Sequence, residues 1–282
     1  MNTPDHPYWG AKAVLTTKHG KGLQIAPAFS KYLNMEVEEL NLDTDQLGTF
    51  SGEIERIGTA REAVIKKAEL GISISGSPIG IASEGSIGVD PFIPFINSDN
   101  ELMALVDQER SLTIIESLRS TEIIAHTLKI SKETQLDNFL LKADFPNHNL
   151  IVRSEDKPVS FCVKGINNKK DLDQAIADGF KDFLELVIEN DLRAHCSPSR
   201  QKNISALAEK LALRLSHLCP ECQAPGWGVI SYKKGLPCQE CGEISEEALA
   251  QEIQGCGRCE FTQVGKTQAE SIDPAQCQLC NP

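Results

Sequence analysis

The chain has 282 residues, and its 28 Lys and Arg stand against 40 Asp and Glu, a formal charge of −12. Hydrophobic residues make up 40% and charged residues 24%, a globular balance that excludes wholesale disorder. An acidic chain does not coat a phosphate backbone through charge, so we do not expect general nucleic-acid binding.

Membrane and secretion signals are absent from the sequence. No uncharged apolar run approaches the roughly 18 residues that a membrane-spanning helix needs. The first ten residues have neither a basic start nor an apolar core, so no secretory signal is visible. We therefore expect a cytoplasmic protein without a membrane partner.

Strand-like and helix-like patterns alternate through the first two hundred residues. Short apolar runs predict strands at residues 13–16, 37–42, 79–82, 102–106, 112–116 and 149–153. Thr59 and Glu62 have the spacing of a capping box that begins a helix. Apolar stripes at helical spacing predict further helices over residues 172–188 and 204–218. We therefore expect an α/β domain over residues 10–214, with a layered mixed sheet and flanking helices.

Eight of the ten cysteines lie in the last 64 residues, as four Cys-x-x-Cys pairs. A two-residue gap lets one tight turn aim two sulfurs at an ion, and a second turn supplies the other two ligands. The spacings match four-thiolate zinc sites, so we expect two structural zinc ions in a double zinc-ribbon-like module over residues 215–282. The expected ligands are Cys219, Cys222, Cys238, Cys241, Cys256, Cys259, Cys277 and Cys280.

The sequence leaves open which cysteine pairs share an ion. We expect sequential pairing, the first pair with the second and the third with the fourth, and an interleaved cross-brace is the alternative. Iron is an alternative to zinc at four thiolates. Disulfides are not expected, because they do not persist in a reducing cytoplasm. The isolated Cys162 and Cys196 are not expected to be ligands.

The cysteine-rich tail is poor in large apolar residues, so the metal must supply its folding free energy. From residue 215 onward it contains four Lys or Arg and nine Asp or Glu, a net charge of −5. That charge counts against a nucleic-acid-binding zinc ribbon. A structural role, or contact with a protein partner, fits the tail better.

Two segments that follow predicted strands have the composition of a binding site. Residues 16–22 form a Gly-rich turn with two lysines, which can hold an anion through its N–H groups and ammonium charge. Residues 82–91 are dense in Gly and Ser and place Glu84 at a strand end, where a carboxylate can bind a hard cation such as Mg²⁺. The structural alternatives are a solvated basic turn and a surface turn.

A third segment, residues 191–200, lies between two predicted helices. It combines an acid with Arg193, His195 and Arg200, a set that can bind an anion or polarise a base. The structural alternative, which we favour slightly, is a helix end followed by an N-cap at Ser199, with ion pairs.

Five segments of the chain carry motifs that also occur together in another group of sequences. They are His19-Gly20-Lys21, the D-T-D-x-x-G-T-F stretch at residues 43–50, A-S-E-G-S at residues 82–86, D-x-R-A-H at residues 191–195, and the eight-cysteine tail. Together they resemble a bacterial family of unknown function, domain of unknown function 6671. The resemblance covers nearly the whole chain and implies no activity.

A more distant resemblance does imply an activity. Residues 14–21 read V-L-T-T-K-H-G-K, residues 62–68 read E-A-V-I-K-K-A, and residues 82–90 read A-S-E-G-S-I-G-V-D. In order and rough spacing they resemble V-L-A-T-x-N-x-x-K, E-N-A-x-x-K-A and A-D-D-S-G-L-x-V-D of inosine triphosphatase-type nucleotide pyrophosphatases.

This chain departs from that pattern at three places. The asparagine of the first motif is replaced around His19. The paired aspartates of the third motif become Ser83 and Glu84. The closing Ser-His-Arg element of those enzymes is only echoed by Ser199-Arg200.

The second resemblance implies roles for individual residues. Thr17 and Lys21 would hold the triphosphate, while Glu62 and Glu84 would hold Mg²⁺ as the catalytic pair, with Lys67 nearby. Water would attack a phosphoanhydride while the metal neutralises the leaving pyrophosphate. The full set of candidate substrate-binding residues is Thr17, His19, Lys21, Lys67, Ser86, Arg193, His195 and Arg200.

The sequence thus supports two hypotheses of function. The first is a Mg²⁺-dependent nucleotide pyrophosphohydrolase with structural zinc. The second is a non-catalytic protein that binds a phosphorylated small molecule and contacts a protein partner through its zinc module. A nucleic-acid-binding protein ranks last, because the tail is acidic.

Overall fold

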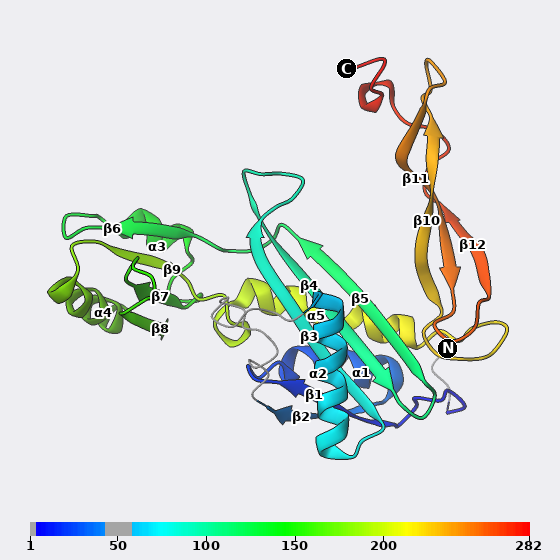
Figure 1. The fold of residues 1–282 in the computed structure, drawn as a ribbon, viewed down its shortest axis with the longest axis horizontal. Helices are drawn as coiled ribbons and strands as arrows, with labels where there is room; N and C mark the ends of the chain where they lie inside the picture. Colours follow the sequence, from blue (N-terminus) through cyan, green and yellow to red (C-terminus); the bar gives the residue numbers. More distant parts are fainter. Residues whose placement is uncertain (1–3, 43–57) are drawn as a thin grey trace.

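The computed structural model describes residues 4–42 and 58–282, and it forms three separate β-sheets (Figure 1). The predicted motif at residues 43–50 lies outside the described residues. The fold is a mixed α/β protein that ends in a double zinc-ribbon-like module, as the sequence predicts. Among the helices of residues 4–42 and 58–282, none is long and apolar enough to cross a membrane.

The first sheet has five strands in the order β2-β1-β3-β4-β5. Its strands are β1 (Lys12–Thr17), β2 (Glu36–Asn41), β3 (Ile79–Val89), β4 (Asn97–Asp107) and β5 (Leu112–Ser120). The first three are parallel to one another, and β4 and β5 continue the sheet as antiparallel strands. Strand β1 ends at Thr17 while its neighbour β3 continues, so the middle of β3 extends past the carboxyl end of β1.

Helices cover both faces of this sheet. Helices α1 (Gly22–Leu33) and α5 (Pro198–Leu215) pack on one face, in a core that includes Leu15 and Leu105. Helix α2 (Ala60–Ser75) packs on the other face. The helices that follow β1 and β2 therefore lie on opposite faces of the sheet, and ligands of open α/β sheets bind at such points.

The region between β5 and α5 forms a second sheet with its own apolar core (Figure 1). Its antiparallel strands, in the order β6-β9-β7-β8, are β6 (Thr127–Ile130), β9 (Leu186–Asn190), β7 (Leu150–Arg153) and β8 (Cys162–Ile166). Helices α3 (Asp137–Lys142) and α4 (Lys169–Asp182) accompany this sheet, and the short helix η2 (Ala194–Cys196) leads to α5.

The third sheet is an arm that projects from the rest of the molecule (Figure 1). It has three antiparallel strands: β10 (Gly228–Pro237), β11 (Ile244–Gly255) and β12 (Thr262–Thr267). A short helix, η3 (Pro274–Gln276), follows close to the last cysteine pair.

Local sequence signals account for several helix ends. The capping box is confirmed: Thr59 is the N-cap of α2, and its side chain and that of Glu62 each accept a backbone N–H of the other residue. The N-cap of α5 is Ser197 rather than the expected Ser199, because Pro198 occupies the first helical position.

Two expected elements differ from the structure. The apolar stripe over residues 172–188 does not form one helix, because α4 ends at Asp182 and the last apolar residues belong to β9. The predicted strand at residues 79–82 continues to Val89, so Glu84 lies inside β3 and not in a turn after it. The signal that sequence spacing misses is pairing with β4 along the whole of β3.

Candidate functional site

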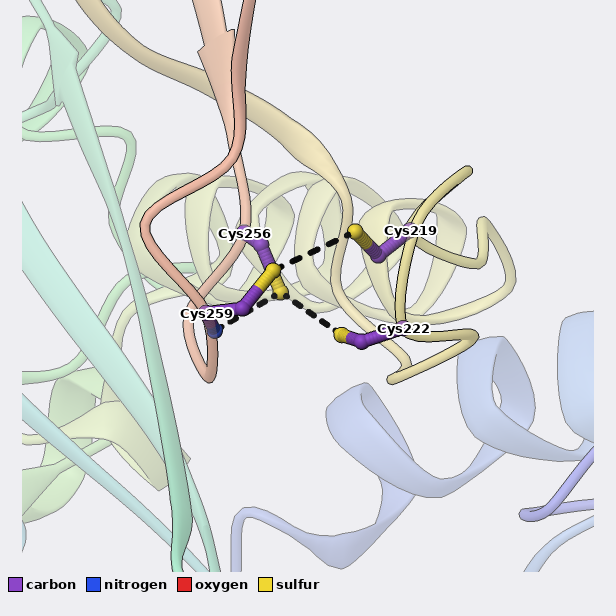
Figure 2. Close-up of side chains that lie close together, drawn as sticks. All are labelled: Cys219, Cys222, Cys256 and Cys259. Carbon is purple, nitrogen blue, oxygen red and sulfur yellow. Dashed lines mark hydrogen bonds between the residues drawn. The ribbon is translucent and has the colours of Figure 1, made fainter.

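The eight cysteines of the arm form two tetrads, and their pairing is interleaved. Cys219 and Cys222 join Cys256 and Cys259, while Cys238 and Cys241 join Cys277 and Cys280. The expectation of sequential pairing is therefore wrong, and the cross-brace alternative is confirmed. Figure 2 shows the first tetrad, whose four sulfurs gather at one place from two loops.

The arm strands explain why the pairing is interleaved. Strand β10 runs from just after the first cysteine pair to just before the second, and β11 returns from the second pair to the third. Gly228 pairs with Gly255 at one end of this hairpin, and Pro237 pairs with Ile244 at the other. A ten-residue strand spans about 33 Å, so consecutive cysteine pairs lie too far apart to share an ion.

The sulfur geometry fits a tetrahedral thiolate site. Sulfurs bound to zinc at about 2.3 Å lie about 3.8 Å from one another. In the first tetrad Cys219 Sγ lies 3.7 Å from Cys259 Sγ, and Cys222 Sγ lies 3.5 Å from Cys256 Sγ. The second tetrad has corresponding distances of 3.8 and 3.6 Å. Both tetrads could therefore bind a metal ion.

Backbone N–H groups near the sulfurs favour thiolates. The N–H groups of Arg258 and Cys259 donate to Cys256 Sγ, at 3.3 and 3.4 Å. Hydrogen bonds from the backbone of Cys241 and Glu240 lower the pKa of Cys238 to about 7. In the same tetrad the neighbouring Cys241 thiol, together with burial, raises the pKa of Cys280 to about 12. Four thiolates therefore need a cation among them.

The first tetrad is fixed to the five-stranded sheet. The Arg214 guanidinium donates to Glu116 on β5 at 2.6 Å and to the Gly226 carbonyl at 3.0 Å. A Cβ at Gly257 would meet Ile114 Cδ1 at 2.5 Å, so the third cysteine loop also lies directly on β5. Trp227 stacks on Phe261 across the tetrad's two loops, with ring centroids 5.5 Å apart.

A second site consists of buried charges around the carboxyl end of β1. Six charged side chains, which we call the buried charge network, are each at least nine-tenths buried. Its members are Lys21, Lys67, Glu84, Asp99, Glu101 and Arg200. They come from the N-cap of α1 and from α2, β3, β4 and α5, segments far apart in the sequence.

Hydrogen bonds and ion pairs hold the members of the network in separate pairs. Lys21 Nζ donates to the Ser83 hydroxyl at 2.9 Å. Lys67 forms a buried ion pair with Glu84 through Oε2. Arg200 Nε donates to Glu101 Oε1 at 2.6 Å, and the Arg200 guanidinium also donates to the Leu192 carbonyl.

Two carboxylates of the network lie side by side on β4. Asp99 and Glu101 are two residues apart, so they face the same side of the sheet, toward α5. Asn203 Nδ2 donates to Asp99 Oδ2 at 2.9 Å, while Asp99 Oδ1 and Glu101 Oε2 accept no hydrogen bond from residues 4–42 and 58–282. Gly85 lies opposite Glu101 in the β3–β4 register, and a Cβ there would fall on the Glu101 carboxylate.

Burial and the charges within the network shift the pKa values of its members. Burial lowers the pKa of Lys21 to about 8, although the charge of Glu101 opposes this shift. Burial and the charge of Glu101 raise the pKa of Asp99 to about 6. Shifts of this kind are typical of functional sites, because such sites gather charges away from water.

The residues predicted from the first strand lie beside this network. Thr17 ends β1, and its hydroxyl accepts the His19 N–H at 3.2 Å. The His19 ring lies 5.5 Å from the His195 ring, centroid to centroid. Burial lowers the pKa of His195. Two segments 176 residues apart thus meet near Lys21.

Three other candidates have different surroundings. Glu62 is exposed, and its carboxylate accepts hydrogen bonds from the Thr59 N–H and hydroxyl. Arg193 forms an ion pair with the buried Asp191, whose carboxylate also accepts the Gly165 N–H. Ser86 is exposed on β3. The structure therefore pairs Lys67 with Glu84 on the α2 side of the sheet and Arg200 with Glu101 on the α5 side, with Lys21 bonded to Ser83 between the strand ends. It gives Glu62 and Arg193 local structural partners.

Sequence reasoning missed Asp99, Glu101 and Asn203. The predicted strand at residues 102–106 begins too late, whereas β4 begins at Asn97 and carries both acids. Two acids at alternate positions beside a buried-strand pattern would have been the signal, because alternate residues share one face. Among the described residues, the two cysteine tetrads are the only groups of three or more ligand side chains with ligand atoms within 4.8 Å.

These features define a class of protein: a mixed α/β protein whose polar network lies at the end of its parallel strands, with a cross-braced pair of cysteine tetrads. The chain belongs to the family described as Domain of unknown function (DUF6671), whose model matches residues 67–282. No curated protein shows significant similarity to the chain.

Proposed function

We propose that the α/β part is a divalent-cation-dependent hydrolase of nucleotide phosphoanhydrides, and that the two tetrads hold structural zinc. The observation that carries this proposal is the buried charge network at the carboxyl end of β1. Burying an ion costs several kcal/mol, and pairing it seldom returns more than that cost. Six such groups lie around one strand end, Glu84 and Lys67 on the α2 side of the sheet and the Asp99–Glu101–Arg200 set on the α5 side. They are therefore better explained by function than by stability.

The position of the network supports the proposal. Ligands of open α/β sheets bind outside the carboxyl ends of the strands, where the connections diverge to opposite faces. Lys21 lies at the start of α1, directly after β1, and Ser83 and Glu84 lie on β3 just beyond the last β1 pairing. The resemblance to inosine triphosphatase-type enzymes, which concerns these same segments, supports a nucleoside triphosphate as the substrate.

Each side chain then has a role in the proposed reaction. Lys21 is mostly protonated at pH 7, because its pKa is about 8, so it and Lys67 would hold phosphate oxygens. Glu84, Asp99 and Glu101 offer the carboxylate oxygens that Mg²⁺ prefers, and Asp99 and Glu101 each have one buried oxygen that no described residue hydrogen-bonds. Mg²⁺ would neutralise charge on the phosphates when bound.

Arg200 is proposed as a positioning residue, because its guanidinium donates to the Glu101 carboxylate. Thr17, His19 and His195 are proposed substrate contacts, since they lie at the end of β1 beside Lys21. Ser86 is a weaker candidate, as it is exposed farther along β3. We propose that Glu62 caps α2 rather than binding Mg²⁺.

Zinc at the two tetrads would stabilise the arm. Its sulfur distances match a tetrahedral ion, and its small apolar core contains only a few side chains, among them Leu236 and Ile272. The proposed division of the chain at residue 215 then separates an α/β part from a part that folds with its metal.

A hydrolysis assay tests the proposal. The zinc-loaded full chain is incubated with a panel of nucleoside triphosphates and MgCl₂, and pyrophosphate release is followed. We expect Mg²⁺-dependent release that falls about a hundredfold or more in Glu84→Gln, since electrostatic stabilisation is usually the largest catalytic contribution. The matched control, Glu122→Gln, removes an exposed acid that forms an ion pair with Lys202. Absence of release, or equal rates for Glu84→Gln and the wild type, would refute the hydrolase.

The arm favours a second candidate function, protein contact. Several of its apolar side chains are about half exposed although the sheet has little core. They are Ile230, Tyr232, Leu249 and Val264. In this second candidate function the α/β part binds a nucleotide without hydrolysing it, while the arm contacts a protein partner. A nucleotide will then raise the melting temperature of the protein without any turnover.

A further inference from the structure

A serine, a histidine and an aspartate form a hydrogen-bonded chain where the second sheet meets α5. His148 is buried, and its Nδ1 lies 2.9 Å from Asp144 Oδ2. Its Nε2 lies 3.0 Å from the Ser199 hydroxyl. A nucleophile bonded to a base, which is itself oriented by an acid, is the arrangement of nucleophilic catalysis.

The surroundings assign the proton on His148. The Ser199 backbone N–H donates to Nε2 at 3.1 Å, so Nε2 is the acceptor and carries no proton. Nδ1 therefore carries the proton and donates it to Asp144. This is the tautomer that a histidine base needs, and the single electron pair of Nε2 is shared between the Ser199 backbone N–H and the Ser199 hydroxyl.

The acid is held in place from a second side. Asn147 Nδ2 donates to Asp144 Oδ1 at 3.1 Å, and hydrogen bonds from Asn147 and His148 lower the pKa of Asp144. Asp144 also has a positive φ of 52°. It directly follows the C-cap of α3, a position where a left-handed residue commonly ends a helix.

The nucleophile has a suitable environment. Ser199 is half-buried in the first turn of α5, and the Ile124 N–H donates to its Oγ at 3.1 Å. The positive end of the helix dipole lies at this turn, where it favours negative charge on a nearby oxygen. The Arg200 side chain next to it turns to Glu101, so the serine chain and the buried charge network are different side-chain sets.

We propose that Ser199, His148 and Asp144 form a second catalytic centre, a hydrolase of esters or other activated acyl groups. Ser199 Oγ forms a bond to the acyl carbon while its proton passes to His148 Nε2. The bond from the acyl carbon to the alcohol oxygen breaks, and the Nε2 proton goes to the leaving alcohol. Water then cleaves the acyl-serine, which releases a carboxylic acid and restores the Ser199 hydroxyl.

A purely structural role predicts a different behaviour. In that case His148 caps α5, because Ser197 makes no side-chain cap bond and the Ser199 N–H is satisfied by Nε2 instead. Ser199→Ala separates the two roles. It retains the backbone N–H and so the cap, but it removes the hydroxyl.

Covalent labelling of the zinc-loaded full chain with a biotinylated fluorophosphonate tests the centre. Attack by Ser199 Oγ on phosphorus expels fluoride, and peptide mass mapping locates the adduct. We expect labelling at Ser199 that falls at least about a hundredfold in Ser199→Ala, with an unchanged melting temperature, and that also falls in His148→Gln. Ser131→Ala, which removes an exposed serine bonded to Thr134, should label as the wild type does.

Two results would overturn the proposal. One is equal labelling of the wild type and Ser199→Ala. The other is a wild-type chain that labels no more than the heat-denatured chain. Neither bears on pyrophosphate release, which depends on Glu84, so the two proposals fail separately.

Discussion

Lys21 is the most informative single residue of the network, because its burial makes the charged ammonium form unfavourable in free energy. Burial lowers its pKa from 10.5 to about 8, with Arg200 and Lys67 acting in the same direction and Glu101 and Glu84 opposing it. The unfolded chain therefore binds more protons at this position between about pH 8 and 10.5. Stability contributed by this residue must rise with pH in that window.

The pH dependence of Lys21→Met tests this assignment. We expect the unfolding free energy of the wild type, relative to that of Lys21→Met, to increase from pH 7.5 to pH 10. Urea denaturation at the two pH values measures it. Lys66→Met, which changes an exposed lysine of α2, should show the wild-type dependence. Parallel curves for the wild type and Lys21→Met would contradict the burial of a charged Lys21.

Glu62 has two possible roles, as the capping residue of α2 or as a ligand of Mg²⁺, and a substitution distinguishes them. Its carboxylate is bonded to Thr59 at the start of α2, and the Thr59 backbone bond is the main reason why its pKa is lowered. We expect Glu62→Gln to keep most of the cap, because glutamine also completes a capping box. Isothermal titration with Mn²⁺ should therefore give the wild-type affinity, while a clear weakening would assign Glu62 to the cation after all.

Strand β3 has a glycine at the position where a larger residue would collide with the network. Gly85 faces Glu101, whose carboxylate is held by Arg200 and cannot move aside easily. We expect Gly85→Ala to destabilise the protein by about 1–3 kcal/mol through overpacking. Gly88→Ala on the same strand is the control, since nothing lies within 4 Å of its Cβ position. Similar unfolding midpoints for the two variants in urea would show that Glu101 is not fixed.

The sequence could predict those elements whose signals are local. The α2 capping box and the short apolar runs of β1, β2, β5 and β7 are set by neighbouring residues, and the structure contains them. The end of α4 is set by tertiary contacts, because Val187 and Ile188 continue a helical stripe but pair with β7. Nothing local distinguishes these two outcomes.

The candidate sites differ in the same way. The cysteine ligands could be predicted, because two-residue spacing is itself the geometric requirement. Their pairing could not be predicted from spacing alone, since it depends on β10 and β11 separating consecutive pairs. Asp99 and Glu101 join the network only through the β3–β4 register and through α5, whose Arg200 and Asn203 are 99 and 104 residues away from their partners in the sequence.

At the scale of the whole molecule, the two tetrads should differ in their coupling to the α/β part. The first tetrad lies on β5 through Gly257 and Arg214, whereas the second lies at the far end of the arm, with Cys241 and Cys280 exposed (Figure 1). Loss of a thiolate from the first should therefore loosen β5, and loss from the second should affect mainly the arm tip.

Cys259→Ser and Cys280→Ser test this difference. Hydrogen exchange should show faster exchange of β5 amides in Cys259→Ser, and unchanged β5 amides in Cys280→Ser. Zinc content, measured by elemental analysis, should fall by one ion in each variant if each tetrad holds its own ion. Equal effects of both variants on β5 would contradict the separate coupling.

The central claim is that the buried charge network binds phosphate groups together with a divalent cation. Calorimetric binding of a non-hydrolysable nucleoside triphosphate analogue to the zinc-loaded full chain tests this claim without requiring turnover. The account predicts binding that needs Mg²⁺ and that Lys21→Met weakens by about tenfold or more, as expected for loss of a charge-assisted hydrogen bond. Equal dissociation constants for the wild type and Lys21→Met, or no binding by either, would contradict it.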